Sequence, residues 1–371
     1  ARPTPGIVDH EVADPHDPTR VRAAARALAR RHPVDGVLTW DEFATVGAAE
    51  AARDLGLPGP RPEAVATCRD KAAARARFDA RRVPSTPWAR VTTAEQAGEA
   101  ARRIGFPVVL KPAGAGGSFG VRKVDTARDL AAAHAFAAEA AARGREDAGL
   151  LVESYLSGPE VSVEVASDHG RHHVLALTHK SLGAEPYFEE TGHLVHGSPD
   201  PGEPAVRVAL AALDAVGLTH GVSHIELRLT PDGPRVIEIN PRPGGDLIPH
   251  LVHLATGVDV VAAAADLSAG LSPDLTPTRD ISAGVRFLYP STAGRLTRLD
   301  IDPRLGEVAW CERAVATRTP GDEVSPPPGD GLHSRLAHVV ATAPTPELCR
   351  ERLDRAAGSL RATITPTRSG R

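Results

Sequence analysis

The sequence is poor in three kinds of residue: it has no methionine, only three cysteines and 4% aromatic residues. Because the chain starts at Ala1 and lacks methionine, we expect its N-terminus to be processed, truncated or incompletely represented. The cysteines, Cys68, Cys311 and Cys349, are far apart and odd in number, which excludes a disulfide framework and a CxxC metal knuckle. These features indicate a reducing, cytoplasmic setting.

Long apolar runs and blocks of like charge are also missing. No stretch approaches the length of a membrane span, and no charged segment followed by an apolar one opens the chain. The net charge is −4 and no basic block stands out, so neither a membrane nor a nucleic acid is expected as a partner. With 371 residues, 42% of them hydrophobic and 24% charged, the chain predicts a globular protein of two or three subdomains.

The most informative stretch is residues 221–240, where two alternating runs flank a Pro-Asp-Gly turn and predict a β-hairpin. Side chains alternate between the two faces of a strand. In the first strand this places on one face His224, Glu226 and Arg228, and on the other Ile225, Leu227 and Leu229. In the second strand it places on one face Val236, Glu238 and Asn240, and on the other Ile237 and Ile239.

The pairing of these strands predicts a metal site. If Leu229 pairs with Arg235 across the turn, Glu226 lies directly opposite Glu238. Like charges so placed destabilise a bare sheet, and a divalent cation reverses the sign of the interaction. Two carboxylates and the amide oxygen of Asn240 are hard ligands that suit Mg²⁺. The alternative is an ordinary amphipathic hairpin with solvated glutamates.

Several other polar residues are candidates for binding an anion or a nucleotide. Lys111 ends an apolar run and leads into a Gly-rich loop at 113–121, whose backbone N–H groups can approach anionic oxygens. The loop is not a Walker A motif, because no Gly-Lys-Ser/Thr follows. Lys71 lies near the start of a predicted helix, and Glu153 and Glu160 lie near the ends of predicted strands. Each is also compatible with simple exposure to solvent.

The polar segment 179–196 contains Lys180, Glu189, Glu190 and a pair of histidines, His193 and His196. A loop that contacts a substrate is the favoured interpretation, and a solvated flap is the next. A zinc site is the third, because the order is not H-E-x-x-H and no further strong ligand follows.

Strand–helix alternation in the first 85 residues favours a parallel, open sheet. This part has a predicted strand at 34–40 and predicted helices at 17–31, 42–55 and 68–82. Farther along, helices are predicted at 92–104, 126–145, 205–216, 259–269 and 346–357. Strands are predicted at 106–112, 150–156, 336–343 and 359–365, with antiparallel strands between 160 and 180.

The order of these motifs resembles the ATP-grasp superfamily. The resemblance rests on Lys71, Lys111 with its Gly-rich loop, Glu153–Leu156, Glu160, Glu226, Glu238, Asn240 and Arg242, and it extends from about residue 34 to residue 365. PYFEETGH followed by IEINPRPGGD looks like the branch that contains the L-amino-acid ligases, which make dipeptides. FLYP, PGDEVSPP and HVVATAPTPELCRERLDRA resemble the C-terminal subdomain of that branch.

The resemblance implies an α/β (α+β) ATP-grasp fold of four parts. These are a partial, Rossmann-like pre-ATP-grasp domain at 1–85, a mobile lid at 86–156, a catalytic subdomain at 157–275 and an antiparallel C-terminal subdomain at 276–371. The implied activity is a carboxylate–amine ligase that forms an amide, expected to be a dipeptide bond, through an acyl phosphate. The expected partners are a small carboxylate and a small amine, both taken to be amino acids, and similar enzymes make a homodimer an expectation.

The resemblance also implies a role for each motif. Arg242 would face the reacting acyl phosphate. ATP would be held by Lys71, Lys111, Gly116, Gly117, Ser118, Glu153, Ser154, Tyr155, Leu156, Glu160 and Lys180. Mg²⁺, expected as two ions for which Mn²⁺ can substitute, would be bound by Glu226, Glu238 and Asn240. The substrate would be contacted by Glu190, His193, Gly244, Gly245 and Asp246.

Three alternatives remain open from the sequence. The same residues serve a ligase for a specialised, non-α-amino acid or natural-product acid. A biotin carboxylase shares the ATP-grasp plan and would need a separate biotin carrier. A nucleotide-binding module without catalysis is the non-enzymatic alternative, although the three metal-binding residues that it would be expected to lose are present.

Overall fold

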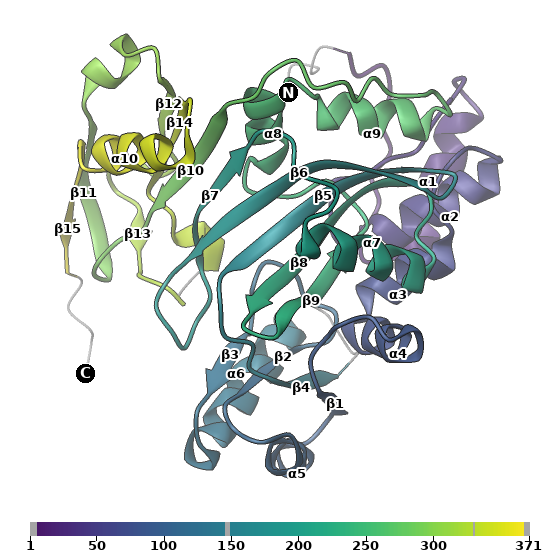
Figure 1. Ribbon diagram of the computed structural model, residues 1–371, viewed down its shortest axis with the longest axis horizontal. Helices are drawn as coiled ribbons and strands as arrows, with labels where there is room; N and C mark the ends of the chain where they lie inside the picture. The colour runs from purple at the N-terminus through teal and green to yellow at the C-terminus, as the bar shows by residue number, and fades with distance from the viewer. Residues whose placement is uncertain (1–5, 145–148, 329–330, 367–371) are drawn as a thin grey trace.

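The computed structural model describes residues 6–144, 149–328 and 331–366. Their strands form three antiparallel sheets (Figure 1). The largest has the order β12 (Cys311–Ala316), β14 (Ala337–Ala343), β10 (Ser282–Leu288), β7 (Glu190–His196), β6 (Arg171–Leu182), β5 (Glu160–Asp168), β8 (Gly221–Thr230) and β9 (Gly233–Asn240). The second has the order β1 (Trp88–Val91), β4 (Leu150–Ser154), β2 (Val108–Pro112) and β3 (Arg122–Val124). The third has the order β13 (Glu323–Val324), β11 (Gly294–Ile301) and β15 (Leu360–Thr365).

The N-terminal part is helical, with α1 (Pro18–Ala29), α2 (Thr45–Leu55), α3 (Pro62–Arg69) and α4 (Lys71–Arg81). As predicted, Asp17 caps α1 by accepting hydrogen bonds from two backbone N–H groups, and Pro18 is the first helical residue. The predicted helix at 68–82 is broken at Asp70. Its side chain instead caps α4, because it accepts hydrogen bonds from the next two free N–H groups of that helix.

The predicted strand at 34–40 and the parallel, open sheet are wrong for the described residues. Residues 34–40 have no assigned strand, and no strand precedes β1 in the part of the chain that the structure describes. A strand needs a neighbour whose N–H and C=O groups pair with its own. Here the neighbouring segments along the chain are the helices α1 and α2, which offer no such edge.

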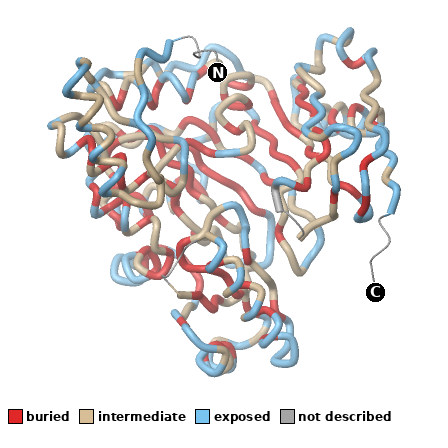
Figure 2. The backbone as a smooth tube through the Cα atoms, turned by 180° about the vertical axis from the view of Figure 1, so that it is seen from behind, coloured by how far each residue is buried: buried red, intermediate tan, exposed pale blue. Residues whose placement is uncertain are grey.

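Helices cover both faces of the eight-stranded sheet (Figure 1). On one face α3, α4 and α7 (Pro204–Val216) share a hydrophobic core with β5, β8 and β9. On the other, α8 (Ile248–Thr256) and α9 (Val260–Ser268) share a core with β6, β7 and β10. Seen from behind, the central strands are buried along most of their length (Figure 2). Among the described helices none alone is long and apolar enough to cross a membrane; α8 and α9, bent by 107°, reach that length and apolarity only as a pair.

The hairpin of β8 and β9 brings Glu226 opposite Glu238, as predicted, but through a different register. Leu229 pairs with Pro234 and not with Arg235, and a β-bulge between Glu226 and Leu227 restores the carboxylate pair. A bulge inserts one extra residue into one strand of the pair.

The bulge also changes which side chains share a face. Val236 and Ile239 both enter the hydrophobic core, whereas Ile237 lines the cavity beside Glu238. The predicted faces of Val236 and Ile237 were therefore wrong. The apolar Ile237 gives the cavity a hydrophobic patch next to its carboxylates.

The four-stranded sheet carries α5 (Ala94–Ile104) and α6 (Leu130–Arg143) and has a hydrophobic core of its own. Thr93 caps α5 as predicted, and the last residue of the helix predicted at 126–145 lies outside the described residues. The Gly-rich loop leaves β2 and packs on α6. A Cβ atom on Gly120, whose φ is +73°, would lie 2.5 Å from the Cβ of Ala140, so only glycine allows this approach.

In the C-terminal part, β14, α10 (Pro346–Ala357) and β15 lie where the sequence predicts them. Two elements near the site were not predicted: β7 was taken for a polar loop, and α8 was not recognised. Short 3₁₀ helices lie at Ala127–Asp129 (η1), Pro303–Glu307 (η2) and Gly331–Ser334 (η3).

We predict that Ile225→Ala lowers the free energy of unfolding by about 2–5 kcal/mol, because it opens a cavity in the core behind the hairpin. Ile225 is 0% exposed on the face of β8 opposite to Glu226. Urea unfolding of the variant measures the change. Val261→Ala on α9, where the side chain is exposed, is the control and should leave the midpoint within experimental error. Equal midpoints for Ile225→Ala and the wild type would contradict this packing.

Candidate active site

One cavity lies between the four-stranded sheet, the Gly-rich loop and the eight-stranded sheet. Its lining includes every residue that the sequence predicts for the site except Lys180, His193 and Gly244. The side chains come from the start of α4, from the strands β2, β4, β5, β7, β8 and β9, and from the loops that follow β2, β4 and β9. Residues from 71 to 248 are thus brought to a single place.

Glu226 and Glu238 face each other across β8 and β9, and each has a cationic partner. Nζ of Lys180 lies 2.8 Å from Oε1 of Glu226, and Nζ of Lys71 lies 3.0 Å from Oε2 of Glu238. The side-chain amide of Asn240 donates a hydrogen bond of 3.0 Å to Glu238. The two carboxylates and the amide predicted to bind a metal therefore line one wall of the cavity.

Both carboxylates are held in their ionised form. Burial opposes ionisation, but Lys180 and His224 hold the pKa of Glu226 well below its usual value. At Glu238, burial favours the protonated carboxyl, but the ammonium group of Lys71 lowers the pKa below its usual value. Burial also disfavours a charged His224, but the Glu164 carboxylate, 2.6 Å from Nδ1, raises the pKa of this histidine to about 10.

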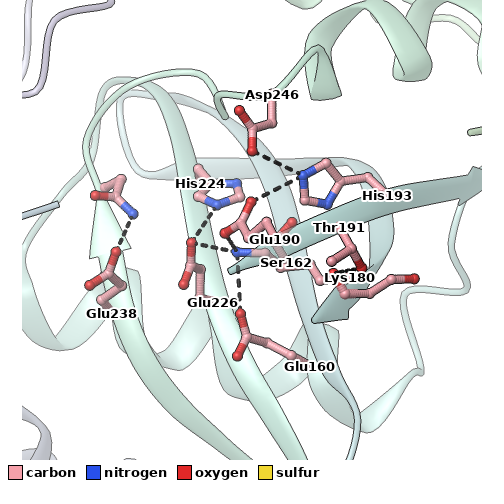
Figure 3. Close-up of polar contacts among 12 residues, drawn as sticks. Glu160, Ser162, Lys180, Glu190, Thr191, His193, His224, Glu226, Glu238 and Asp246 are labelled. Carbon is pink, nitrogen blue, oxygen red and sulfur yellow. Dashed lines mark hydrogen bonds and ion pairs between the residues drawn. The ribbon is translucent and has the colours of Figure 1, made fainter. Parts of the chain in front are cut away.

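Lys180 does not line the cavity. It lies below the cavity floor with a side chain that is 1% exposed, and its Nζ contacts Glu160 at 3.2 Å, Glu190 at 2.6 Å and Glu226 at 2.8 Å (Figure 3). Burial works against the ammonium, yet these carboxylates raise the pKa of Lys180 well above its usual value. The structure therefore assigns Lys180 to the neutralisation of acidic side chains, whereas the sequence predicted contact with ATP.

Lys111 has a buried carboxylate partner. Its Nζ lies 2.6 Å from Oε2 of Glu153, and Nε of Arg75 lies 2.8 Å from the other oxygen. Arg75 also donates to the carbonyl oxygen of Ile237, which ties α4 to the bulged strand. Burial favours a neutral Glu153, but Arg75 and Lys111 lower its pKa to about 2. Arg75, which the sequence analysis missed, thus helps Glu153 to orient Lys111.

A second group of ion pairs lies at the end of the site that is predicted to contact the substrate. Asp246 receives two hydrogen bonds of 2.6 Å from Arg335, and Nε2 of His193 lies 3.1 Å from Glu190 and 3.5 Å from Asp246. Burial alone would raise the pKa of Asp246 and lower the pKa of His193. Even so, Arg335 and His193 hold the pKa of Asp246 well below its usual value, and Asp246 and Glu190 raise the pKa of His193.

Asp246 and Leu247 are held in an unfavourable backbone conformation. Their φ angles are +53° and +67°, which costs a non-glycine residue about 1–3 kcal/mol each. The bidentate pair with Arg335, which comes from the C-terminal part of the chain, compensates at this point. Arg335 was missed because nothing near it in the sequence marks it as part of a site.

His193 and His196 do not form the zinc site that was one alternative. They lie on opposite faces of β7, since strand side chains alternate. His193 is buried beside Glu190, and Nδ1 of His196 lies 2.8 Å from the hydroxyl oxygen of Ser282. Glu190, His193 and Asp246 are close enough to hold an ion, but Lys180 and Arg335 already neutralise the two carboxylates.

Glu42 is a further residue that the sequence analysis missed. Its carboxylate pairs with both Arg69 and Arg242, and its side chain lies against Gly116 of the Gly-rich loop. Arg242, predicted to face the acyl phosphate, therefore already holds an anionic group from the N-terminal part of the chain. Two guanidinium groups around one carboxylate form a site for an anion.

The Glu153 pair leads to a prediction about pH. Because the pKa of Glu153 is about 2 in the folded protein and 4.5 is its ordinary value, the stabilisation is complete above pH 4.5 and is lost as the pH falls toward 2. The free energy of unfolding of the wild type should fall by roughly 2 kcal/mol more between pH 6 and pH 3 than that of Glu153→Gln. Urea unfolding at each pH measures this difference. The exposed Glu347→Gln is the control, and parallel curves for Glu153→Gln and the wild type would refute the assignment.

Three family matches cover most of the chain. Residues 5–59 match the ATP-grasp N-terminal domain, residues 104–250 the ATP-grasp domain, and residues 286–365 the L-amino acid ligase C-terminal domain 2. In solved structures, the chain is similar to an L-amino acid ligase from Bacillus licheniformis, with a TM-score of 0.78, 23% identity and coverage of 94% of this chain and 85% of that one. A biotin carboxylase from Campylobacter jejuni gives a TM-score of 0.67 at 20% identity, over 95% and 79% of the two chains.

Relatives in sequence agree with these matches. The protein y4rH of Sinorhizobium fredii is 33% identical over 91% of this chain and 70% of its own length. Carnosine synthase 1 of Gallus gallus is 32% identical over 65% of this chain, which spans 27% of that protein. A D-alanine–D-alanine ligase of Verminephrobacter eiseniae is 29% identical over 59% of this chain and 65% of its own length. The chain belongs to the ATP-grasp family, and it is an ATP-grasp ligase of the L-amino acid ligase family.

Proposed function

We propose that this ligase joins the carboxylate of one amino acid to the amine of another through an acyl phosphate and releases ADP and phosphate. The observation that carries the proposal is the facing pair Glu226 and Glu238, ionised in a cavity that also contains Lys71, Lys111 and Arg242. Acidic side chains concentrate cations, and basic side chains concentrate phosphate oxygens. Both are needed to bring MgATP close to a carboxylate.

The donors in the cavity fit Mg²⁺. Glu226 and Glu238 supply ionised oxygens, Asn240 supplies an amide oxygen, and all three lie on one wall. Hard oxygen donors of this kind suit a small divalent cation that keeps some of its waters. We propose that these residues hold two Mg²⁺ ions, for which Mn²⁺ can substitute. When bound, the metal would neutralise phosphate charge during phosphoryl transfer.

The first chemical step would transfer the γ-phosphoryl group of ATP to a carboxylate oxygen of the acid substrate. This transfer depends on alignment and on charge neutralisation rather than on a protein nucleophile. Lys71 and Lys111 point into the cavity from α4 and β2, and Glu153 orients Lys111. The Gly-rich loop, through Gly116, Gly117 and Ser118, would cover the phosphates, while Ser154–Leu156 and Glu160 would hold the adenosine part.

In the second step a neutral amine would attack the carbonyl carbon of the acyl phosphate, and phosphate would leave. Negative charge develops on the carbonyl oxygen in this step, and Arg242, which lines the cavity, would stabilise it in place of part of its contact with Glu42. The closed loop would exclude water, which otherwise hydrolyses the intermediate. The proton lost by the amine would pass to solvent with the products.

The assignment to amino acid substrates rests on the family and on the ionic group at one end of the cavity. Glu190 and Asp246 line that end, with His193 behind them and Gly244 and Gly245 between the metal wall and Asp246. Paired acidic and basic groups are complementary to a zwitterion. Relatives named D-alanine–D-alanine ligase support the same substrate class. The match at 286–365 favours a ligase over a biotin carboxylase, with which the chain shares the ATP-grasp fold.

We also propose subdomain boundaries at 85/86, 156/157 and 275/276. In the described residues, the small four-stranded sheet with its own core falls between the first two of these boundaries. A homodimer stays a prediction.

We predict that Glu238→Ala abolishes phosphate release from ATP in the presence of Mg²⁺ and mixed amino acids. The variant loses one of the two facing carboxylates and leaves Lys71 without its carboxylate partner. A coupled phosphate assay measures the rate, and unchanged circular dichroism shows that the fold is retained. The exposed Glu347→Ala is the matched control and should keep wild-type activity. Near-normal turnover of Glu238→Ala would rule out the metal assignment.

A second prediction concerns Arg242→Lys, which keeps the charge and loses the planar fork of the guanidinium group. Loss of one donor to a developing oxyanion lowers the rate by about 10²–10³. We therefore expect kcat to fall by this factor while the affinity for ATP changes little. Steady-state kinetics with varied ATP separate the two effects. A variant as fast as the wild type would remove Arg242 from the mechanism.

A further inference from the structure

A second cavity lies on the other side of the Gly-rich loop. Its lining comes from four parts of the chain: the segment before α2, the Gly-rich loop with α6, the loop between β6 and β7, and Pro328. The two cavities share residues 115–119, Val121 and Phe188 as a wall. A molecule in the second cavity would therefore lie directly beside the nucleotide site.

The second cavity collects a large share of the few aromatic side chains of the chain. Its lining includes four of the seven phenylalanines of the sequence, with one tyrosine beside them: Phe43, Phe119, Phe136, Phe188 and Tyr187. The other three phenylalanines pack in the hydrophobic cores. Every phenylalanine outside those cores therefore faces this cavity.

Only some of these aromatic rings pack against one another. The rings of Phe136 and Tyr187 lie 5.6 Å apart, which joins α6 to the loop between β6 and β7. Phe119, in contrast, is 42% exposed on the Gly-rich loop. Its ring lines both cavities. Aromatic rings gain most when another ring or apolar group covers them, so the cavity suits an apolar, ring-sized group.

The cavity also contains an acidic side chain without a basic partner. Of its two lining carboxylates, Glu139 pairs with Arg143 at 2.6 Å, whereas Glu189 has no ion pair among the described residues. Glu189 is half-buried, and burial raises its pKa. A partly desolvated carboxylate next to apolar rings is complementary to an ammonium group.

We propose that this cavity binds the amine-donating substrate and that this substrate is an amino acid with an aromatic or similarly large apolar side chain. The side chain lies among Phe43, Phe136 and Tyr187, and the ammonium group faces Glu189, which accepts a proton from it so that the neutral amine attacks the acyl phosphate. The proposal rests on the proposed function. It adds a substrate class and a binding site separate from the ionic group at Asp246.

The positions of the two cavities support this division of the substrates. The acid substrate has to lie next to the metal wall and Arg242, in the first cavity, because its carboxylate receives the phosphoryl group. Near the metal wall and Arg242 the lining includes the charged side chains of Glu190 and Asp246, with Gly245 and Ile248 beside them. The amine has to reach the carbonyl carbon across the shared wall, so the Gly-rich loop would close and exclude water only after both substrates are bound.

The test uses amines that cannot act as the acid. L-phenylalaninamide and glycinamide are titrated by calorimetry into the full-length protein with Mg²⁺ and a non-hydrolysable ATP analogue. We expect the wild type to bind L-phenylalaninamide at least about tenfold more tightly than glycinamide, as is usual for a side chain that fills an apolar pocket. Phe136→Ala should lose most of this preference, with unchanged binding of glycinamide. Glu189→Gln should weaken the binding of both amides by a similar factor.

Controls separate a packing defect from the loss of the pocket. Phe136→Leu should restore part of the preference, Phe43→Ala is an independent variant of the same lining, and Val261→Ala on α9 should keep the wild-type ratio. The affinity for the ATP analogue reports whether each variant is folded. Equal or undetectable binding of the two amides by the wild type, or an unchanged ratio in the folded Phe136→Ala and Phe43→Ala variants, overturns the proposal. If no amino acid pair releases phosphate from ATP, the proposed function fails instead, and the titrations still decide whether the cavity binds an aromatic amine.

Discussion

The ammonium group of Lys180, placed among three carboxylates, is the interaction on which the site depends. Glu226 and Glu238 face each other across β8 and β9, Glu160 comes from β5 beside β8, and Glu190 comes from β7 on the far side of β6. Without a buried cation these carboxylates would repel one another or take up protons. Lys180 meets three of them from β6, and Lys71 meets the fourth from α4. Glu226 and Glu238, whose pKa values are lowered, are therefore ionised before any metal arrives.

Charges of alternating sign continue from this centre in both directions (Figure 3). The order runs through Glu164, His224, Glu226, Lys180, Glu190, His193, Asp246 and Arg335. Buried ion pairs are weak sources of stability, because desolvation offsets much of their attraction. Their value here is geometric, since each group fixes the rotamer of the next. The network joins the hairpin to Arg335 in the C-terminal part and supports the positive φ angle of Asp246.

The parts of the fold that the sequence predicts correctly are those that local rules control. Helix caps at Asp17 and Thr93 are short-range hydrogen bonds, and the hairpin follows from alternation and a turn. The parallel sheet fails because pairing depends on a neighbour that periodicity cannot supply. The register of the hairpin fails for a related reason. The bulge near Glu226 depends on how the strands pack, not on the turn, so an incorrect pairing of Leu229 still led to the correct pair of carboxylates.

The candidate site shows the same difference between features set by local sequence and features set by long-range contacts. Motif residues could be found because their chemistry is visible within a few positions, as with Lys111 before its glycines. Their partners could not: Glu42 is 200 residues from Arg242, Arg75 is 162 from Ile237, and Arg335 is 89 from Asp246. Each of these partners is an ordinary charged residue in its own segment. What makes it functional is the removal of water around a pair that the fold assembles, because low dielectric strengthens such contacts and makes an unpaired charge costly. The need for a counter-charge can be inferred from a buried-type motif, but the residue that meets the need is known only once the chain is folded.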